Sequence, residues 1–402
     1  MTTFPARAGL RPTRKRHITL CVLIDALGWK VLEDQYFLND VLAFRQPLKT
    51  VLGFSSAAIP SLLTGRAPSE HGHWNLFYYD PEHSPFARLR WLRYLPGALV
   101  NHRVSEKLIK EAGRHLFHMG PQFECYVKPA LMPWFNWVER RCIYEPGGIS
   151  GAPSIFDKLM EAGIPYRAYS YHHYNDKEIL ERANDDLQNS DAEFFFVYLC
   201  ELDAELHAFW TEPERLQARL NAYGTHIHTL LDTALRVDSE ASIAVFSDHG
   251  MAPVTNRYDL VKDIHALGWN MPGDYLAVYD STMARFWFFN EETRQSINKR
   301  LAAERCGRIL AEAELQELGV LFPDRRYGET IFLLDSGYMF YRSDFHSGNW
   351  LPAGMHGYHP NDSYSDAVFL CNRAPIDPLH CIRDIYSYMA SCAGLSSTEL
   401  VV

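Results

Sequence analysis

The chain has 402 residues, 47% of them hydrophobic, so it is long enough to bury a large core, and its composition excludes a disordered protein. Its formal net charge of −10 at pH 7 argues against a nucleic-acid groove or an anionic membrane surface as partner, because both require clustered positive charge. A phosphate-containing ligand would need local cations, and we expect bound metal ions to supply them.

The cysteines and the N-terminal region bear on the cellular compartment. The 8 cysteines are scattered without a CxxC pair, and several stand inside apolar runs, so we expect most of them to be small buried hydrophobic residues. Residues 1–16 are polar and basic, and we expect a flexible segment there. The apolar run from Ile18 to Ile24 is too short for a membrane span and makes a poor signal peptide. We therefore expect a cytoplasmic protein with no membrane partner.

Short apolar runs alternate with helical patterns along most of the chain. The first run, HITLCVLID at residues 17–25, is nearly continuous in apolar and β-branched residues, which is typical of a parallel strand covered on both faces. Similar runs follow at Tyr166–Tyr171, Phe194–Leu199, Ile243–Phe246 and Ala367–Leu370, with helical patterns at Pro153–Ala162, Lys177–Leu187 and Glu214–Val237. This alternation predicts an α/β fold whose mostly parallel central sheet is flanked by helices.

Two stretches interrupt the alternation. Residues 76–148 are crowded with aromatic and basic residues, and we interpret them as a cap inserted near the site. Residues 271–349 mix the strand-like segments ARFWFF and ETIFLL with a helical segment at Glu291–Arg308, which predicts a small α+β subdomain.

Polar residues stand next to the apolar runs, where an open α/β sheet binds ligands. They comprise three aspartates and three histidines: Asp25, Asp203, His207, Asp248, His249 and His356. Hard oxygen and imidazole donors in this mixture suit two divalent ions, with zinc preferred and manganese or iron as alternatives. Taken singly, a strand-end aspartate is more often a helix cap or turn former. Their joint occurrence at the expected positions favours the metal interpretation.

The segment GFSSAAIPSLLTG, residues 53–65, offers a nucleophile. Ser55 and Ser56 precede a run that is compatible with a helix, so a hydroxyl oxygen would stand at a helix N-terminus, where backbone N–H groups and the helix dipole favour phosphate. The alternative is that the two serines only cap the helix.

The motifs LIDALGW, SSAAIPSLLTG, LDAELH, FSDHGM and GMHGYHP together resemble, in order and chemistry, the type I phosphodiesterase and nucleotide pyrophosphatase family of the alkaline phosphatase superfamily. The resemblance covers nearly the whole chain and implies an alkaline-phosphatase-like catalytic domain over residues 17–402. It also implies a two-metal hydrolase that cleaves a phosphodiester or nucleotide pyrophosphate through a covalent phosphoseryl-type intermediate. Its partner would be a small phosphate ester, such as one derived from a nucleotide.

The resemblance also implies roles for individual residues. The family places its nucleophile ten residues before the Gly of a Thr-Gly pair, which points from Gly65 to Ser55, with Ser56 as the runner-up. One ion would be bound by Asp25, Ser55, Asp248 and His249, and the other by Asp203, His207 and His356. Asn75 would bind a phosphate oxygen, although it follows His71 by four residues where the family usually has five.

The chain departs from related patterns at other positions. Ala57 and Ile59 stand where sulfatases require Pro and Arg, which argues against a sulfatase. Leu202 and Leu206 stand where the family usually has Pro and Gly, next to the Asp and His of its DxxxH element. A phosphomonoesterase, phosphonate hydrolase or phosphomutase of the same superfamily remains an alternative, as does a non-catalytic metal-binding module. The oligomeric state is left open.

Overall fold

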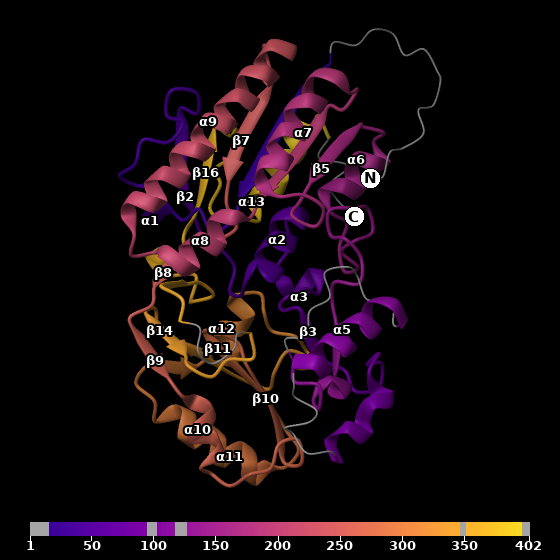
Figure 1. Cartoon of the computed structure of the whole chain (residues 1–402), viewed down its shortest axis with the longest axis vertical. Coiled ribbons are helices and arrows are strands. Elements are labelled where there is room, and N and C mark those ends of the chain that lie inside the picture. Colours follow the sequence, from indigo (N-terminus) through magenta and orange to yellow (C-terminus); the bar gives the residue numbers. More distant parts are fainter. Residues whose placement is uncertain (1–15, 95–102, 117–126, 346–350, 396–402) are drawn as a thin grey trace.

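The computed structural model describes residues 16–94, 103–116, 127–345 and 351–395, which form two lobes around two sheets (Figure 1). The larger sheet has six strands in the order β2-β16-β7-β1-β6-β5. In that order the strands are Phe44–Leu48, Ala367–Cys371, Ser242–Phe246, Thr19–Ile24, Phe194–Leu199 and Tyr166–Tyr169. The predicted runs therefore form five of these six strands.

The larger sheet is mostly parallel. β1 lies between β6 and β7 and is parallel to both, while β16 pairs in antiparallel fashion with β7 and β2. All six residues of β1 are buried, because helices cover both faces of the sheet. The predicted fold class is confirmed. β2, with the sequence FRQPL, was not predicted, since it is an edge strand that contains Pro47 and buries only Leu48.

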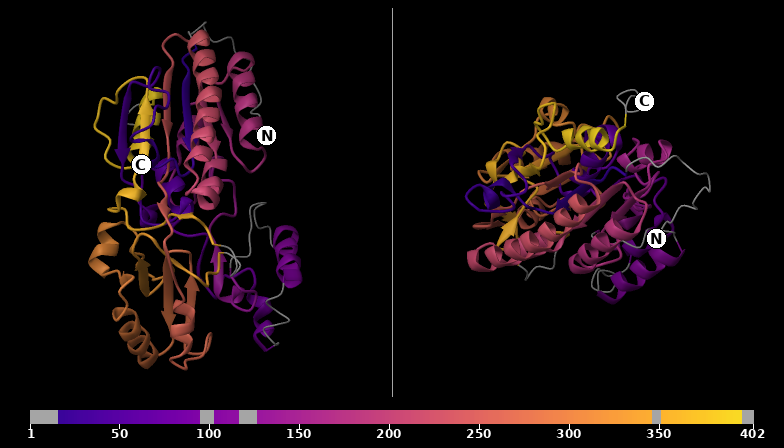
Figure 2. Two further views of the ribbon diagram at one scale, coloured as in Figure 1. Left: turned by 60° about the vertical axis from the view of Figure 1, so that its left-hand side comes forward. Right: turned by 90° about the horizontal axis from the view of Figure 1, so that it is seen from above.

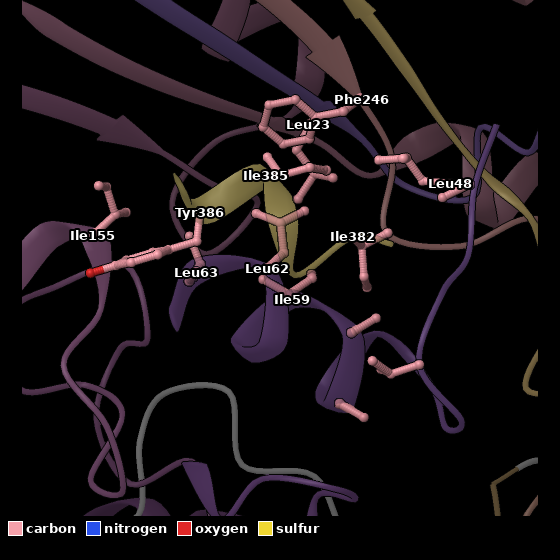
Figure 3. Packing of buried hydrophobic residues seen from close by; sticks show 14 of the residues in the cluster. Leu23, Leu48, Ile59, Leu62, Leu63, Ile155, Phe246, Ile382, Ile385 and Tyr386 are labelled. Atoms are coloured by element: carbon pink, nitrogen blue, oxygen red, sulfur yellow. The ribbon is translucent and has the colours of Figure 1, made fainter. Parts of the chain in front are cut away.

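Helices cover the two faces of this sheet (Figure 2). One face carries α1 (Trp29–Leu32), α7 (Asp176–Asn189), α8 (Glu201–Phe209) and α9 (Pro213–Val237). The other carries α2 (Ser55–Thr64), α6 (Ile155–Glu161) and α13 (Asp384–Cys392). Leu62 of α2 and Ile385 of α13 are fully buried beneath the sheet (Figure 3), which fixes the start of α2 relative to the strand ends.

The smaller lobe contains a four-stranded antiparallel sheet in the order β10-β11-β13-β12. Its strands are Tyr275–Tyr279, Met283–Phe288, Thr330–Leu334 and Gly307–Ile309, and its helices are α10 (Leu260–His265), α11 (Glu291–Ala302) and α12 (Glu312–Glu317). The helix predicted to reach Arg308 ends at Ala302. The reason is strand pairing: a Cβ at Gly307 would lie 2.4 Å from the Leu333 carbonyl oxygen, so glycine allows β12 to approach β13.

The predicted cap contributes a second part of the smaller lobe. It contains β3 (Phe77–Tyr79), η1 (Ala87–Tyr94), α5 (Arg103–Leu116), η2 (Met132–Trp134) and β4 (Phe135–Trp137), with β3 and β4 paired. Most of its described aromatic residues pack in a core with the small sheet. The Phe135 ring, for example, meets the Trp287 ring of β11 edge to face at 5.4 Å.

Several short elements complete the two lobes. These are α3 (Pro68–His71), η3 (Ser363–Ser365) and the paired strands β8 (Ala252–Pro253) with β15 (Gly354–Met355) and β9 (Asn256–Tyr258) with β14 (Tyr338–Phe340). Residues 1–15 of the predicted flexible segment lie outside the described part, and the Arg16 guanidinium donates to the carbonyl oxygens of Leu187 and Ala192. The helices that the structure describes include none that is both long and apolar enough to span a bilayer.

Candidate active site

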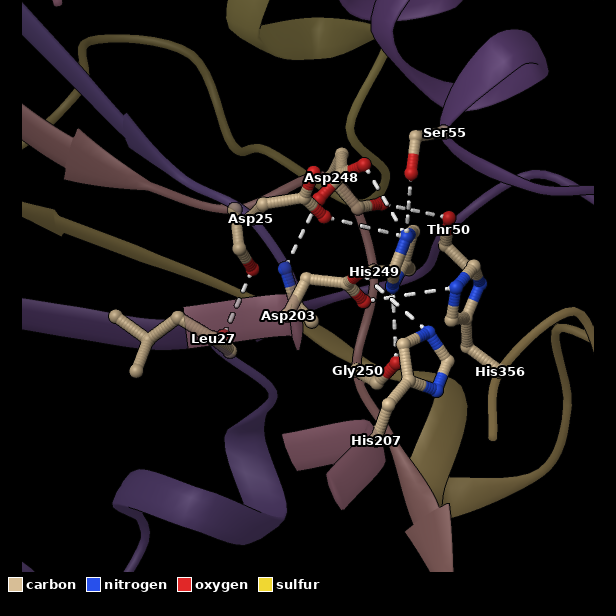
Figure 4. A network of polar contacts seen from close by, with 12 residues as sticks. Asp25, Leu27, Thr50, Ser55, Asp203, His207, Asp248, His249, Gly250 and His356 are labelled. Carbon is tan, nitrogen blue, oxygen red and sulfur yellow. Dashed lines mark hydrogen bonds and ion pairs between the residues drawn. The ribbon is translucent and has the colours of Figure 1, made fainter. Parts of the chain in front are cut away.

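The strand order brings several segments to one edge of the larger sheet. β1, β6 and β7 are parallel, so the residues that follow them meet there. β16 runs the other way and begins at that edge, so the loop before it arrives at the same place. Together with the start of α2, these segments carry all seven residues of the predicted metal site (Figure 4): Asp25 after β1, Ser55 on α2, Asp203 and His207 on α8, Asp248 and His249 after β7, and His356 before β16.

We refer to Asp25, Asp248 and His249 as the buried group, because these residues are only 4%, 0% and 3% exposed. Their ligand atoms lie within 4.8 Å of one another. His249 Nε2 is 3.5 Å from Asp25 Oδ1, 3.3 Å from Asp248 Oδ2 and 3.0 Å from Ser55 Oγ. Four polar atoms from three separate segments therefore surround one point.

We refer to Asp203, His207 and His356 as the open group, since their side chains are 23%, 15% and 9% exposed. Their ligand atoms also lie within 4.8 Å of one another. His207 Nε2 is 3.4 Å from Asp203 Oδ2, and His356 Nε2 is 3.6 Å from Asp203 Oδ1. Asp203 and His207 share one face of α8, as the spacing of four residues predicts.

Backbone carbonyl groups orient two of the three histidines. The Nδ1–H of His207 donates to Gly354 at 2.8 Å, and that of His249 donates to Gly250 at 2.9 Å. This assigns the proton to Nδ1 and leaves the Nε2 lone pair directed at the aspartates, as metal-binding histidines require. His356 differs, because its Nδ1 has no hydrogen-bond partner among the described residues. Its ring stacks on His249 with centroids 3.9 Å apart.

Each aspartate has one buried oxygen without a hydrogen-bond partner in the part of the chain that the structure describes. These atoms are Asp25 Oδ1, Asp203 Oδ1 and Asp248 Oδ2. An unpaired buried carboxylate oxygen costs folding free energy, so three at one place are unfavourable without a cation. Together with inward-facing imidazole nitrogens, they are chemically suited to divalent ions.

The charges within the buried group repel one another. Burial, together with the neighbouring carboxylates of Asp248 and Asp203, raises the pKa of Asp25 well above its usual range. The Tyr198 hydroxyl donates to Asp25 Oδ2 and opposes this rise. Asp25 is therefore a carboxylate whose ionised form is unfavourable until positive charge is placed beside it.

The open group has the reverse balance. Burial works to raise the pKa of Asp203, but His207 and His356 outweigh it and hold that pKa below its usual range. Burial likewise works to lower the pKa of His207, yet Asp203 outweighs it and raises that pKa. Burial lowers the pKa of His356 well below its usual value, which keeps its imidazole neutral. The open group thus balances much of its own charge internally.

Ser55 is the first residue of α2 and contacts the buried group directly. Its Oγ is 3.0 Å from His249 Nε2, and because the His249 proton resides on Nδ1, the Ser55 hydroxyl donates to this nitrogen. The first N–H groups of a helix have no intrahelical acceptor, so they point towards any anion bound at Ser55. Ser56 also lines the adjacent cavity. Within the part of the chain that the structure describes, its hydroxyl forms no hydrogen bond to a residue of the buried or the open group.

A cavity of about 340 Å³ opens beside Ser55 and the open group. Tyr144 and Ile143 of the cap line it, together with Tyr171, His172 and Tyr198 from the larger lobe. Among the residues that the structure describes, no lysine or arginine lines this cavity. Glu139 does line it, and burial raises the pKa of that carboxyl to about 7.

Residues 19–359 match the sequence model of the type I phosphodiesterase / nucleotide pyrophosphatase family. The chain belongs to this family. The resemblance seen in the motifs is therefore confirmed, and the protein is a hydrolase that acts on phosphodiester or pyrophosphate bonds. Comparison with curated protein sequences gives no match.

Solved structures of the family share the fold. Human ectonucleotide pyrophosphatase / phosphodiesterase 5 superposes with a TM-score of 0.67 at 12% identity, over 94% of this chain and 96% of that one. An inactive Thr-to-Ala variant of the murine protein, in complex with AMP, gives 0.67 at 14% identity, over 95% and 96%. At such low identity, these solved structures support a shared fold and nothing further.

The side chain predicted to bind phosphate, Asn75, is 2% exposed and belongs to a buried network. Its Nδ2 donates to Asp280 at 3.3 Å, and its Oδ1 accepts from the Leu76 backbone at 2.8 Å. Asp280 in turn forms an ion pair at 2.9 Å with Arg285, which is fully buried. Asn75 therefore has one remaining amide hydrogen for a ligand, and its role in binding phosphate stays a prediction.

Packing explains the two departures from the family pattern on α8. Leu202 and Leu206, which replace the family's usual Pro and Gly, lie on the buried face of α8, and the helix that carries Asp203 is regular.

The sequence analysis missed two residues that contact the buried group. Tyr198 donates to Asp25, and Thr50 donates to the Asp248 carbonyl oxygen at 2.7 Å. Tyr198 is hidden within the apolar run of β6, so nothing in the pattern distinguishes it from a core residue.

Proposed function

We propose that this chain is a two-metal nucleotide pyrophosphatase/phosphodiesterase that uses Ser55 as its nucleophile. The observation that carries the proposal is the convergence of Ser55 Oγ, Asp25 Oδ1 and Asp248 Oδ2 on His249 Nε2, at 3.0, 3.5 and 3.3 Å. The buried group and Ser55 would bind one divalent ion, and the open group would bind the other. Zinc is the proposed metal, since oxygen and imidazole ligands are mixed.

The geometry favours a cation site over a serine–histidine–aspartate triad. In a triad the carboxylate accepts from the imidazole nitrogen that faces away from the serine. In this chain both aspartates lie on the Nε2 side with Ser55, and the Nδ1–H of His249 donates to the Gly250 carbonyl. The lone pairs of His249 Nε2, Asp25 Oδ1 and Asp248 Oδ2 face one another, and this arrangement is unfavourable unless a positive charge lies between them.

Divalent ions bound at the two groups would lower the pKa of the Ser55 hydroxyl and neutralise charge on the phosphate oxygens. Ser55 Oγ, at the start of α2, would then attack phosphorus in line with the leaving oxygen. The Oγ–P bond forms as the P–O bond to the leaving group breaks, and the leaving alcohol or phosphate takes up a proton. Water then cleaves the Oγ–P bond, which releases the second product and restores the Ser55 hydroxyl.

The cavity beside Ser55 favours a diester or pyrophosphate over a monoester. A monoester is dianionic, and no lysine or arginine of the described residues lines the cavity to meet the additional charge. Tyr144, Tyr171 and His172 provide rings beside which a flat group can bind. A nucleotide-derived substrate is consistent with the AMP complex of the murine relative. The aromatic residues at the centre of the cap instead pack in its core.

Turnover of bis-p-nitrophenyl phosphate and p-nitrophenyl phosphate by the zinc-loaded protein tests this proposal. We expect the diester to be preferred, and we expect Ser55→Ala to lose at least about 1000-fold in kcat, equal to roughly 4 kcal/mol, while both ions stay bound. Ser56→Ala is the matched control and should retain most activity. Near-full activity of Ser55→Ala would contradict the mechanism, and a preference for the monoester would support a phosphomonoesterase.

A further inference from the structure

The tip of the β10–β11 hairpin, residues 280–282, reaches from the smaller lobe into the site of the larger one. Asp280 holds the Asn75 amide, and Ser281 lines the cavity beside Ser55. Thr282 is fully buried, and its hydroxyl donates to the backbone carbonyl oxygens of Gly357, at 3.0 Å, and His356, at 3.3 Å. The tip therefore contacts the segment that carries one residue of the open group.

Of the three site histidines, His356 has the ring whose orientation is held least directly by hydrogen bonds. His207 and His249 each donate Nδ1–H to a carbonyl group, whereas Nδ1 of His356 has no hydrogen-bond partner within the described part of the chain. Its ring meets His249 at 3.9 Å and Phe54 at 5.5 Å, contacts that restrict the ring plane but fix no nitrogen. The position of His356 Nε2 therefore depends on how firmly its backbone is held.

The backbone at this point is shaped to receive Thr282. Gly357 has a φ of +87°, and a Cβ there would lie 2.9 Å from Thr282 Oγ1 and 2.7 Å from Phe54 Cε1. Glycine therefore permits both the turn after His356 and the close approach of the hydroxyl. Thr282 is itself held, since its carbonyl oxygen accepts from the Leu334 backbone at 2.9 Å.

We propose that Thr282 is a positioning residue of the open group, which fixes the backbone of His356 and so sets the affinity for one of the two metal ions. The proposal rests on the two-metal function proposed above. It gives the smaller lobe a part in the chemistry of the larger one, through a hydroxyl that contacts neither substrate nor ion. An outer-shell partner of this kind typically contributes about 10–100-fold in metal affinity.

The test is a zinc titration of metal-free protein against a chelating indicator, which resolves two binding steps. Thr282→Val keeps the shape but removes the donor, and we expect one step to weaken by about 10–100-fold while the other changes less than about twofold. The weakened step must be the one that His356→Ala abolishes. Thr282→Ser, which keeps the hydroxyl, should bind both ions as the wild type does.

Thr233→Val is the matched control, because Thr233 of α9 is also buried and its hydroxyl donates to Asn184 Oδ1 of α7 at 2.8 Å. It should lower thermal stability without changing either binding step. If valine packs badly at position 282, Thr282→Ala removes the same donor with less bulk. Unchanged zinc affinities in a folded Thr282→Val or Thr282→Ala protein, or equal weakening of both steps, would overturn the proposal. Failure of the wild type to bind two ions would instead overturn the proposed function.

Discussion

The buried group and the open group use similar ligands in opposite electrostatic settings. In the buried group, two carboxylates crowd together with a single histidine, and the pKa of Asp25 is raised well above its usual range by burial and by neighbouring carboxylates. In the open group, a single carboxylate faces two histidines, and the pKa of Asp203 is held below its usual range despite burial. The buried group is therefore the less favourable of the two without an ion. In the open group the histidines compensate much of the Asp203 charge, although Asp203 Oδ1 also lacks a hydrogen-bond partner among the described residues.

In the proposed mechanism, this difference would give the two groups different parts in folding and catalysis. The unpaired oxygens of Asp25 and Asp248 cost folding free energy that a bound cation would recover, so binding there should couple strongly to stability. The open group borders the cavity through all three of its residues, which suits contact with the leaving group and with water. Two predictions examine this comparison, and a third concerns the cavity that the open group borders.

The largest effect is expected from removing one charge in each group. In the metal-loaded enzyme, Asp25→Asn and Asp203→Asn should each lower kcat by more than the roughly 100-fold that loss of an outer-shell partner costs. In the metal-free protein at pH 7 their effects on stability should have opposite signs. Asp25→Asn removes an ionised form that folding disfavours and should raise Tm, whereas Asp203→Asn removes a favourable charge and should lower it.

The measurement is thermal unfolding of both metal-free variants between pH 4 and pH 8. The folded pKa of Asp203 is lowered, so its contribution to stability is present above its unfolded pKa, and the deficit of Asp203→Asn should persist across this pH range. The advantage of Asp25→Asn should shrink with falling pH, because wild-type Asp25 becomes neutral as well. Equal Tm changes of the same sign in the two variants would show that the groups do not differ as described.

Much of this comparison was accessible from sequence. An apolar run such as residues 19–24 predicts a buried strand, and residues that follow parallel strands meet at one edge of the sheet. Asp25, Asp248 and Asp203 each follow such a run, so the sequence predicts that they lie together at that edge. The sequence also separates the ligands into two groups through the family resemblance. What it lacks is burial: no pattern distinguishes the 0% exposure of Asp248 from the 23% of the Asp203 side chain.

Features set by long-range packing were missed for a related reason. Thr282 and Gly357 meet across 75 residues of sequence, and neither belongs to a motif that marks its partner. The end of α11 was misplaced because residues 303–308 keep a helix-compatible composition, and only the pairing of Gly307 with Leu334 turns the chain into a strand. Such contacts follow from the folded sheet and not from local periodicity.

A smaller effect is expected from pH on the open group. Asp203 raises the pKa of His207, so a proton competes for His207 Nε2 above the ordinary histidine value. Zinc affinity of the open group should therefore fall by about tenfold per pH unit once the pH drops below that raised pKa. Zinc titrations of Asp248→Asn, in which the buried group is impaired, measure this at pH 8, 7 and 6. A pH-independent affinity over this range would contradict the prediction.

The smallest effect concerns Glu139, the acidic residue that the cap contributes to the cavity. Burial raises its pKa to about 7, so the carboxylate is largely charged at pH 8 and largely neutral at pH 6. Because it repels an anionic diester only when charged, Glu139→Gln should lower KM at pH 8 by about 2–5-fold, from an interaction of roughly 0.5–1 kcal/mol. At pH 6 the variant and the wild type should have similar KM values.

The same substitution has a consequence for stability. A raised carboxyl pKa means that ionisation costs folding free energy between the ordinary glutamate pKa and about 7, so wild-type stability falls as the pH rises through that range. Glu139→Gln should therefore raise Tm at pH 8 but not at pH 4. Glu145→Gln is the matched control, since Glu145 is exposed in the same segment and lies outside this cavity. An equal response of both variants in KM would mean that Glu139 acts through general surface charge and not within the cavity.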